Sequence, residues 1–266
     1  MLQLTLSLIG ADGSVRGSST GEGLVQLDTR YREYQPGDVI VLQSSERGVE
    51  LEVMLDESLP PSIVYLENGR LEFPIPFDAA RDSYPSHAFG GDTHWGYARV
   101  LDPRERSNWC NLALNSHDLG GAEGVFPHAV TNSGATNPRF IARNAIDGTW
   151  QSIHHGRWPY ESWGINGRDD AWLQVDFGRP VHAEEAVLVL RADFPHDTWW
   201  KQARITCSDG FELTVQLEKT GVPQRFDLGG RDIEWIKLSN LVKADDPAEF
   251  PALTQLAVMG TLAQIG

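Results

Sequence analysis

Short runs of alternating apolar and polar residues follow one another along most of the chain, and helical periodicity is hard to find. Residues 2–9 (LQLTLSLI) alternate over most of their length, and residues 49–55 alternate apolar with acidic side chains until Met54. Such period-two runs, punctuated by Gly, Pro, Asn and Asp, are typical of half-buried β-strands. Further strands are expected at residues 23–27, 39–42, 63–66 and 71–77. About six strands at this spacing predict a small β-sandwich, with 71–77 at a sheet edge because its prolines cannot donate to a neighbour.

The second half of the chain also consists of short strand-like runs separated by turns, but more of these runs are continuously apolar. Strands are expected at residues 171–177, 186–190, 203–207, 212–217, 233–238 and 253–258, with turns at 208–210 and 227–230. A run that is apolar at every position, as in 186–190, suits a strand that is covered on both faces. Residues 77–107 are rich in Ser, Pro, His and Gly and contain the expected junction near 102–106. The sequence therefore predicts an all-β fold with two β-sandwich domains, residues 1–105 and 106–266.

Four motifs in the second half resemble the discoidin family, or coagulation-factor type C domains. Their galactose-binding-like jelly roll is shared with many bacterial carbohydrate-binding modules. The motifs are CNLALN at 110–115, ARNAIDG at 142–148, WLQVDFG at 172–178 and LTQLAVMG at 253–260. The resemblance spans roughly residues 108–260 and implies a discoidin-like jelly roll with ligands bound by loops at one end. Motifs of this kind specify a fold more strongly than a function.

Composition narrows the class of partner. The 266 residues include 37 acidic and 22 basic side chains, a net charge of −15, and contain no run of lysine or arginine. Binding to nucleic acid or to a membrane surface depends on such positive charge, so neutral partners are expected. No apolar run approaches the ~20 residues of a membrane helix, and the N-terminus lacks the basic region of a signal peptide. With only two cysteines, the chain is expected to be cytoplasmic.

The loop over residues 147–163 is dense in groups that bind sugars. It holds three Trp, one Tyr, two His and one Arg. An aromatic ring packs against the apolar face of a pyranose, while charged side chains hydrogen-bond to its hydroxyls. Trp163 is expected to be structural, because it lies where the resembled family keeps a structural Trp. The candidate ligand-binding residues in this loop are His154, His155, Arg157, Trp158 and Tyr160.

A second polar and aromatic stretch, residues 191–201, follows an expected strand and should also lie at a loop end. Its candidate ligand-binding residues are Arg191, Asp193, His196, Asp197, Trp199 and Trp200. In the alternative interpretation, Arg191 and Asp193 form a structural ion pair and one of the paired tryptophans belongs to the core.

Asp147 raises the possibility of a bound cation. In the resembled family the loop after this motif often holds a structural Ca²⁺, with the Asp, backbone carbonyls and an acidic residue on the last strand as ligands. Thr254–Gln255 stands where that acidic residue is expected, so the site is weakened and Asp147 could instead cap the turn. The cofactor expectation is therefore none, or a structural Ca²⁺ at Asp147. A metal held by His87, Asp92 and His94 is a weaker alternative, since an ordinary Gly-rich loop explains those residues.

The expected function is non-catalytic carbohydrate binding, with a neutral saccharide or glycan held by the loops 147–163 and 191–201. On this hypothesis Trp158 or Trp199 stacks on the sugar, while Arg157, His155 and Asp193 bind hydroxyls.

Two other functions stay open. The chain could be a hydrolase or lyase acting on a saccharide, because paired catalytic carboxylates leave no sequence spacing. It could also be a protein-interaction adaptor whose exposed tryptophans form an interface. Enzyme motifs give no support, since the Gly-x-Ser-x-Gly match at 17–21 lacks the flanking strand and helix of a nucleophile turn and is interpreted as a flexible turn.

Overall fold

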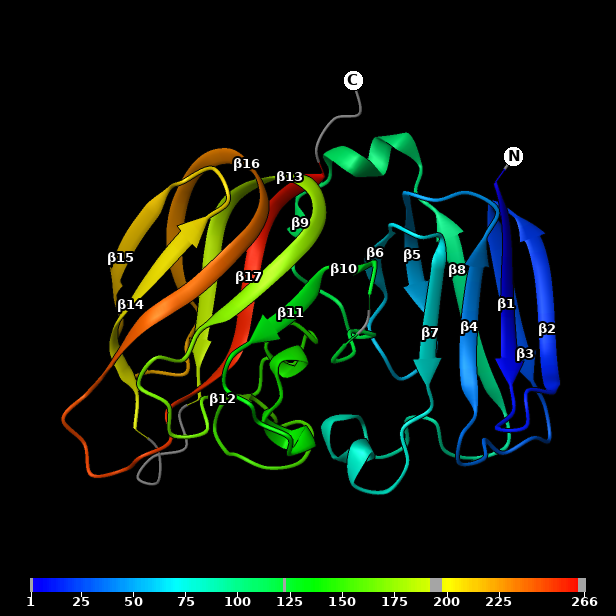
Figure 1. Ribbon diagram of the computed structural model, residues 1–266, viewed down its shortest axis with the longest axis horizontal. Coiled ribbons are helices and arrows are strands. Elements are labelled where there is room, and N and C mark those ends of the chain that lie inside the picture. Colours follow the sequence, from blue (N-terminus) through cyan, green and yellow to red (C-terminus); the bar gives the residue numbers. More distant parts are fainter. Residues whose placement is uncertain (1, 122, 192–197, 263–266) are drawn as a thin grey trace.

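Figure 1 shows the computed structural model, which describes residues 2–121, 123–191 and 198–262. Its regular structure is almost entirely β-strand, arranged as two sandwiches that lie side by side. The N-terminal half of the chain forms most of one sandwich, and the C-terminal half forms the other. The prediction of an all-β fold is therefore confirmed. No helix in the described part of the chain is long and apolar enough to cross a membrane.

The N-terminal sandwich consists of two antiparallel sheets, one with strand order β2-β1-β4-β7 and one with order β10-β6-β5-β8-β3. The strands are β1 (Gln3–Ile9), β2 (Val15–Glu22), β3 (Leu24–Thr29), β4 (Val39–Ser44), β5 (Val49–Met54), β6 (Ser62–Leu66), β7 (Arg70–Pro74), β8 (His94–Val100) and β10 (Val125–Phe126). The alternation in β1 buries Leu4, Leu6 and Leu8, as its period-two pattern requires. As its prolines predict, β7 lies at a sheet edge.

Several segments that were not expected to be strands are strands, among them two in the N-terminal sandwich. Residues 17–21, interpreted as a flexible turn, lie inside β2, which pairs with β1 along its length. The other is β8, which lies within the Ser-, Pro- and His-rich stretch and pairs with both β3 and β5. In each segment, pairing with neighbouring strands of the sheet outweighs a weak local preference for strand.

The strands of the C-terminal sandwich form one hydrogen-bonded sheet of order β12-β17-β13-β16-β14-β15, to which β9 adds at β17 and β11 at β13. They are β9 (Cys110–Asn111), β11 (His128–Thr131), β12 (Trp163–Gly164), β13 (Leu173–Leu190), β14 (Trp200–Cys207), β15 (Glu212–Gln216), β16 (Gln224–Lys243) and β17 (Ala252–Leu262). The turn expected at 227–230 lies inside β16, because Gly229 and Gly230 adopt positive φ and bend the strand without ending it.

Four short 3₁₀ helices punctuate the loops in the described part of the chain: η1 (Asp78–Ser83), η2 (Pro103–Ser107), η3 (Pro138–Phe140) and η4 (Ala142–Ala145). The expected domain junction falls at η2, which Asp102 begins with a capping box completed by Glu105. The chain returns to the first sandwich after this point, since β10 pairs with β6. The division at residue 105 therefore remains a proposal.

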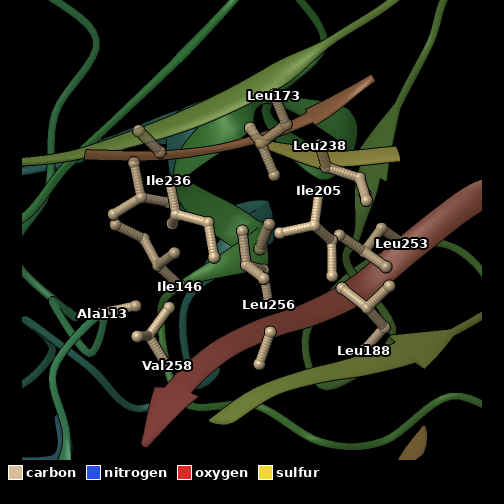
Figure 2. Close-up of a cluster of buried hydrophobic side chains, with 14 of the residues drawn as sticks. Ala113, Ile146, Leu173, Leu188, Ile205, Ile236, Leu238, Leu253, Leu256 and Val258 are labelled. Carbon is tan, nitrogen blue, oxygen red and sulfur yellow. The ribbon is translucent and has the colours of Figure 1, made fainter. Parts of the chain in front are cut away.

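Each sandwich encloses its own apolar core. The C-terminal core gathers side chains from several strands and from the loop before Asp147, and Figure 2 shows them pointing toward one another. They include Ile146, Leu188, Ile205, Ile236 and Leu256. Each core also includes a contact from the other half of the chain. Val125, which follows the expected junction, belongs to the N-terminal cluster, and Ile63 of β6 packs against the C-terminal cluster.

A polar seam joins the two sandwiches. The Glu50 carboxylate in β5 forms ion pairs with Arg106 in η2 and Arg179 in β13. The backbone N–H of Leu55 donates to His117 Nε2 at 3.1 Å. Burial, and then the charge of Arg143, lowers the pKa of His117 to about 3, so its ring is neutral and can accept this bond.

Gly178, at the bend of β13, should tolerate no side chain. Its φ is +68°, and a Cβ there would clash with the ring of Phe126 in β10. Gly178→Ala is expected to lower the free energy of unfolding by roughly 2–5 kcal/mol, combining left-handed backbone strain with a steric clash. Gly210→Ala is the control, because Gly210 also has positive φ but a Cβ on it would meet no other side chain or backbone atom within 4 Å.

Urea denaturation measures both variants. The control should lose only about 1–2 kcal/mol, and Phe126→Ala should lessen the cost of Gly178→Ala in a double-mutant cycle. Equal losses in the two glycine variants would contradict the assigned clash.

Candidate functional site

A pocket of about 570 Å³ lies beside the end of β13 and the start of β17. Its lining comes from distant parts of the chain: Gly134, Ala135, Thr136, Asn137, Phe140, His155, Gly164, Ile165, Asn166, Arg191, Phe250, Pro251 and Ala252. This volume falls within the range of about 300–1,000 Å³ that is usual for sites that hold small molecules.

Arg191 is the buried charged group of the pocket. Only 6% of its surface is exposed, and its Nη2 donates to the backbone carbonyl of Phe250 at 2.6 Å. Its backbone N–H donates to the carbonyl of Ala252 at 3.1 Å, and its guanidinium carbon lies 6.0 Å from the centre of the Phe140 ring. These contacts hold a planar group with several donors in one orientation, which favours recognition of paired acceptors.

Aromatic and amide side chains complete the pocket. Phe250 is 60% exposed, so its ring is open to solvent and to a ligand. Asn137 begins η3, where its Oδ1 accepts from the backbone N–H of Arg139 at 3.1 Å. Asn166 has φ +52°, a left-handed conformation that asparagine adopts more readily than most residues. The pocket therefore combines an exposed ring with hydrogen-bonding groups on defined backbone turns.

Two of the predicted ligand-binding residues, His155 and Arg191, line this pocket, one from each predicted loop. Arg157 and Trp158 do not line it, because both are held by the first sandwich at Asp82. Arg157 Nε lies 2.9 Å from Asp82 Oδ1, and the backbone N–H of Trp158 donates to the backbone carbonyl of Asp82 at 2.7 Å. Trp158 instead lines a cavity of about 340 Å³ at the seam.

The remaining predicted residues are more scattered. Trp200 is 1% exposed, with its ring centre 6.0 Å from that of Trp163, so the expectation that it contacts a ligand is corrected: it is part of the core. Trp199 packs against the same core. His154 and Tyr160 contact each other edge to face at 5.1 Å. Asp193, His196 and Asp197 lie outside the described residues.

Most of the lining residues escaped the sequence interpretation, among them Asn137, Phe140, Asn166 and Phe250. These four lie in loops or at the short helix η3, where aromatic and charged side chains are not dense, so only the fold places them together. The available signal was Phe250 itself, a large apolar residue between Glu249 and Pro251 with no strand pattern to bury it.

A buried acidic pair lies at the base of the 147–163 loop. Asp147 is 4% exposed and Glu161 is 1% exposed. Asp147 Oδ1 accepts from the Thr149 N–H and from Gln255 Nε2, both at 2.8 Å. Asp147 Oδ2 and both carboxylate oxygens of Glu161 are buried without a hydrogen-bond partner. Such oxygens are costly to bury as anions, so this pair needs a proton or a cation.

Electrostatics supports the same conclusion. Burial, followed by the charge of Asp147, raises the pKa of Glu161 to about 8. Burial also raises the pKa of Asp147, although the nearby Arg143 opposes it. Oxygen donors at a tight turn are the ligands that Ca²⁺ prefers, and Ca²⁺ at Asp147 was one of the two alternatives given by the sequence. The carboxylate that accompanies Asp147 is that of Glu161, whereas Gln255 on the last strand donates its amide N–H to Asp147.

No family model matches this chain, and no curated protein is similar to it in sequence. Solved structures that are similar to it include carbohydrate-binding modules. One is chitosan-binding module 1 of a chitosanase/glucanase from Paenibacillus sp. IK-5, at 19% identity and TM-score 0.39, covering 57% of this chain and 99% of that one. Another is a family 32 module of C. perfringens NanJ in complex with galactose, at 20% identity and TM-score 0.37, covering 49% and 91%. A third is a Streptococcus pneumoniae fucose-binding module, at 13% identity and TM-score 0.40, covering 57% and 95%.

In a chelator-containing buffer, the protein should lose stability as pH rises from about 5 to 8. Glu161 ionises near its ordinary pKa in the unfolded chain but only near 8 in the folded one. Between these two pKa values Glu161 is ionised in the unfolded state but still protonated in the folded state. Raising the pH over this interval therefore stabilises the unfolded state relative to the folded one. Glu161→Gln should flatten the pH profile, and the difference in melting temperature at pH 8 should exceed about 3 °C.

Thermal melts at a series of pH values test this expectation. Glu67→Gln, at an exposed turn, is the control and should follow the wild-type profile. A wild-type melting temperature that rises between pH 5 and 8, or an equal slope in Glu161→Gln, would contradict it.

Proposed function

We propose that this protein binds a neutral carbohydrate without transforming it, and that the pocket around Arg191 holds the sugar. The observation that carries the proposal is the pairing of a buried, oriented guanidinium with the exposed ring of Phe250, whose carbonyl the guanidinium contacts. The two groups offer a pyranose what its two kinds of surface need: a flat apolar face for its C–H bonds and fixed donors for its hydroxyls.

The other lining residues fit the same ligand. His155 and the amides of Asn137 and Asn166 can donate to and accept from hydroxyls at once, as a sugar requires. The net charge of −15 disfavours polyanionic ligands, so a neutral saccharide or glycan is the proposed class.

Binding is favoured over hydrolysis by the pocket's own composition. Hydrolysis of a glycosidic bond ordinarily requires two carboxyl groups that flank it. Among the described residues that line this pocket there is no Asp or Glu. The described lining residues therefore supply no such pair of carboxyl groups, whereas a binding site needs none.

Phe250→Ala should weaken binding of a matching sugar about tenfold, because an aromatic contact of this kind contributes roughly 1 kcal/mol or more. His155→Ala should weaken it as well, through loss of a hydroxyl partner. A glycan array of neutral saccharides first identifies a ligand, and isothermal titration calorimetry then compares the variants.

Trp158→Ala is the matched control, because it removes an exposed tryptophan of the same loop that does not line the pocket. It should leave affinity unchanged. Loss of binding in Trp158→Ala with none in Phe250→Ala would move the site to the seam cavity, and absence of any sugar response would overturn the proposal.

We also propose that Ca²⁺ binds between Asp147 and Glu161. Their unpartnered carboxylate oxygens would ligate the ion, and its charge would offset the buried acidic pair beneath the loop that carries His155. Ca²⁺ should raise the melting temperature of the wild type more at pH 8 than at pH 5, because ligands must lose their protons to bind metal.

Glu161→Gln should abolish this rise in melting temperature, while Glu67→Gln should retain it. A wild type that Ca²⁺ does not stabilise at pH 8 would show that a proton alone satisfies the pair.

A further inference from the structure

A group of metal-type ligands lies in the N-terminal sandwich, far in sequence from the pocket. Asp56, Glu57 and His94 each present one possible ligand atom, and the three atoms lie within 4.8 Å of one another. The strand topology explains why these three side chains lie close together. The strands β5 and β8 are antiparallel neighbours, so the turn that follows Met54 at the end of β5 reaches the start of β8 at His94.

His94 is oriented as a metal ligand would be. It is 2% exposed, and its ring stacks on Tyr34 with ring centres 4.0 Å apart. Its Nε2 lies 3.1 Å from the carbonyl oxygen of Gly91, a group that can only accept, so Nε2 carries the proton. The lone pair is therefore on Nδ1, which is buried without a hydrogen-bond partner. Metal-bound histidines commonly donate their other N–H to a backbone carbonyl in this way.

The two carboxylates are held in place by the backbone. Asp56 is 1% exposed and accepts from the N–H groups of Ser58 at 3.0 Å and Phe89 at 2.8 Å. Glu57 is exposed, and its Oε2 accepts from the Trp95 N–H at 3.2 Å. Neither carboxylate forms an ion pair with a lysine or arginine in the described part of the chain. Two acidic groups therefore lie close to the His94 ring with no lysine or arginine paired to either of them among the described residues.

We propose that Asp56, Glu57 and His94 bind a divalent transition-metal ion of the Zn²⁺ type. Imidazole nitrogen with carboxylate oxygen suits zinc, whereas Ca²⁺ prefers oxygen ligands alone. Tetrahedral Zn²⁺ with bonds near 2.0–2.2 Å places two of its ligand atoms about 3.4 Å apart. Binding would therefore draw the three ligand atoms closer together, the exposed Glu57 side chain can move toward the ion, and water would complete the coordination.

The ion would join the turn after β5 to the start of β8. The site would belong to the N-terminal sandwich and would be independent of the proposed sugar and Ca²⁺ sites. Of the residues His87, Asp92 and His94, which the sequence suggested as possible ligands, only His94 belongs to this group.

Isothermal titration calorimetry with ZnCl₂ on the full-length protein, in Ca²⁺-saturated buffer, tests the proposal. The wild type should bind one equivalent. Glu57→Gln should weaken this binding at least tenfold, because it removes an anionic ligand from an exposed side chain without creating a cavity. His94→Phe should abolish it while keeping a ring stacked on Tyr34. His87→Gln is the matched control, since it removes an exposed histidine of the same segment.

Near-UV circular dichroism of the metal-free variants shows that they are folded, and Co²⁺ substitution gives an absorption band that reports nitrogen and oxygen ligation. Binding that survives both Glu57→Gln and His94→Phe, or that His87→Gln abolishes, would overturn the assignment and place the ion elsewhere. Failure of the wild type to bind Zn²⁺ would show that the trio is a hydrogen-bonded turn only.

Discussion

The structure depends on the buried guanidinium of Arg143, which is 4% exposed and lies where the two sandwiches meet. It donates to the carbonyl oxygens of Ser116 at 2.9 Å and Asp118 at 3.1 Å, and lies over the Tyr84 ring at 4.4 Å. Burial alone would lower the pKa of Arg143, but the surrounding acidic groups outweigh burial and raise it. A buried charge is tolerated only with such partners, so this side chain fixes the loops of both halves around it.

The acidic pair lies beside this guanidinium, and the loop over residues 147–163 connects the pair to the pocket around Arg191. Asp147 lies in the same motif as Arg143, and the guanidinium offsets part of the charge that Asp147 and Glu161 bring into the interior. Across the seam, Asp82 holds Arg157 and the Trp158 backbone against the first sandwich. The same loop presents His155 on the pocket beside the end of β13. The loop over residues 147–163 therefore contacts both regions: Arg157 and Trp158 lie at the seam, and His155 lines the pocket.

The seam differs from both cores because its contacts are polar and directional. Apolar clusters such as the one in Figure 2 tolerate exchange of similar side chains, whereas the Glu50, His117 and Arg143 contacts each need one donor or acceptor in one place. This explains how two sandwiches, each with its own core, keep a defined relative placement.

The sequence by itself determined the all-β fold, most strand positions and the edge position of β7, because period-two burial and the missing proline N–H are local properties. It also directed attention to His155 and Arg191. Only the tertiary structure decided that Trp200 is core, that Glu161 faces Asp147, and that β2 and β8 are strands. It alone brought Phe250 to Arg191. These outcomes depend on pairing and burial between residues far apart in the chain, and no local pattern encodes such contacts.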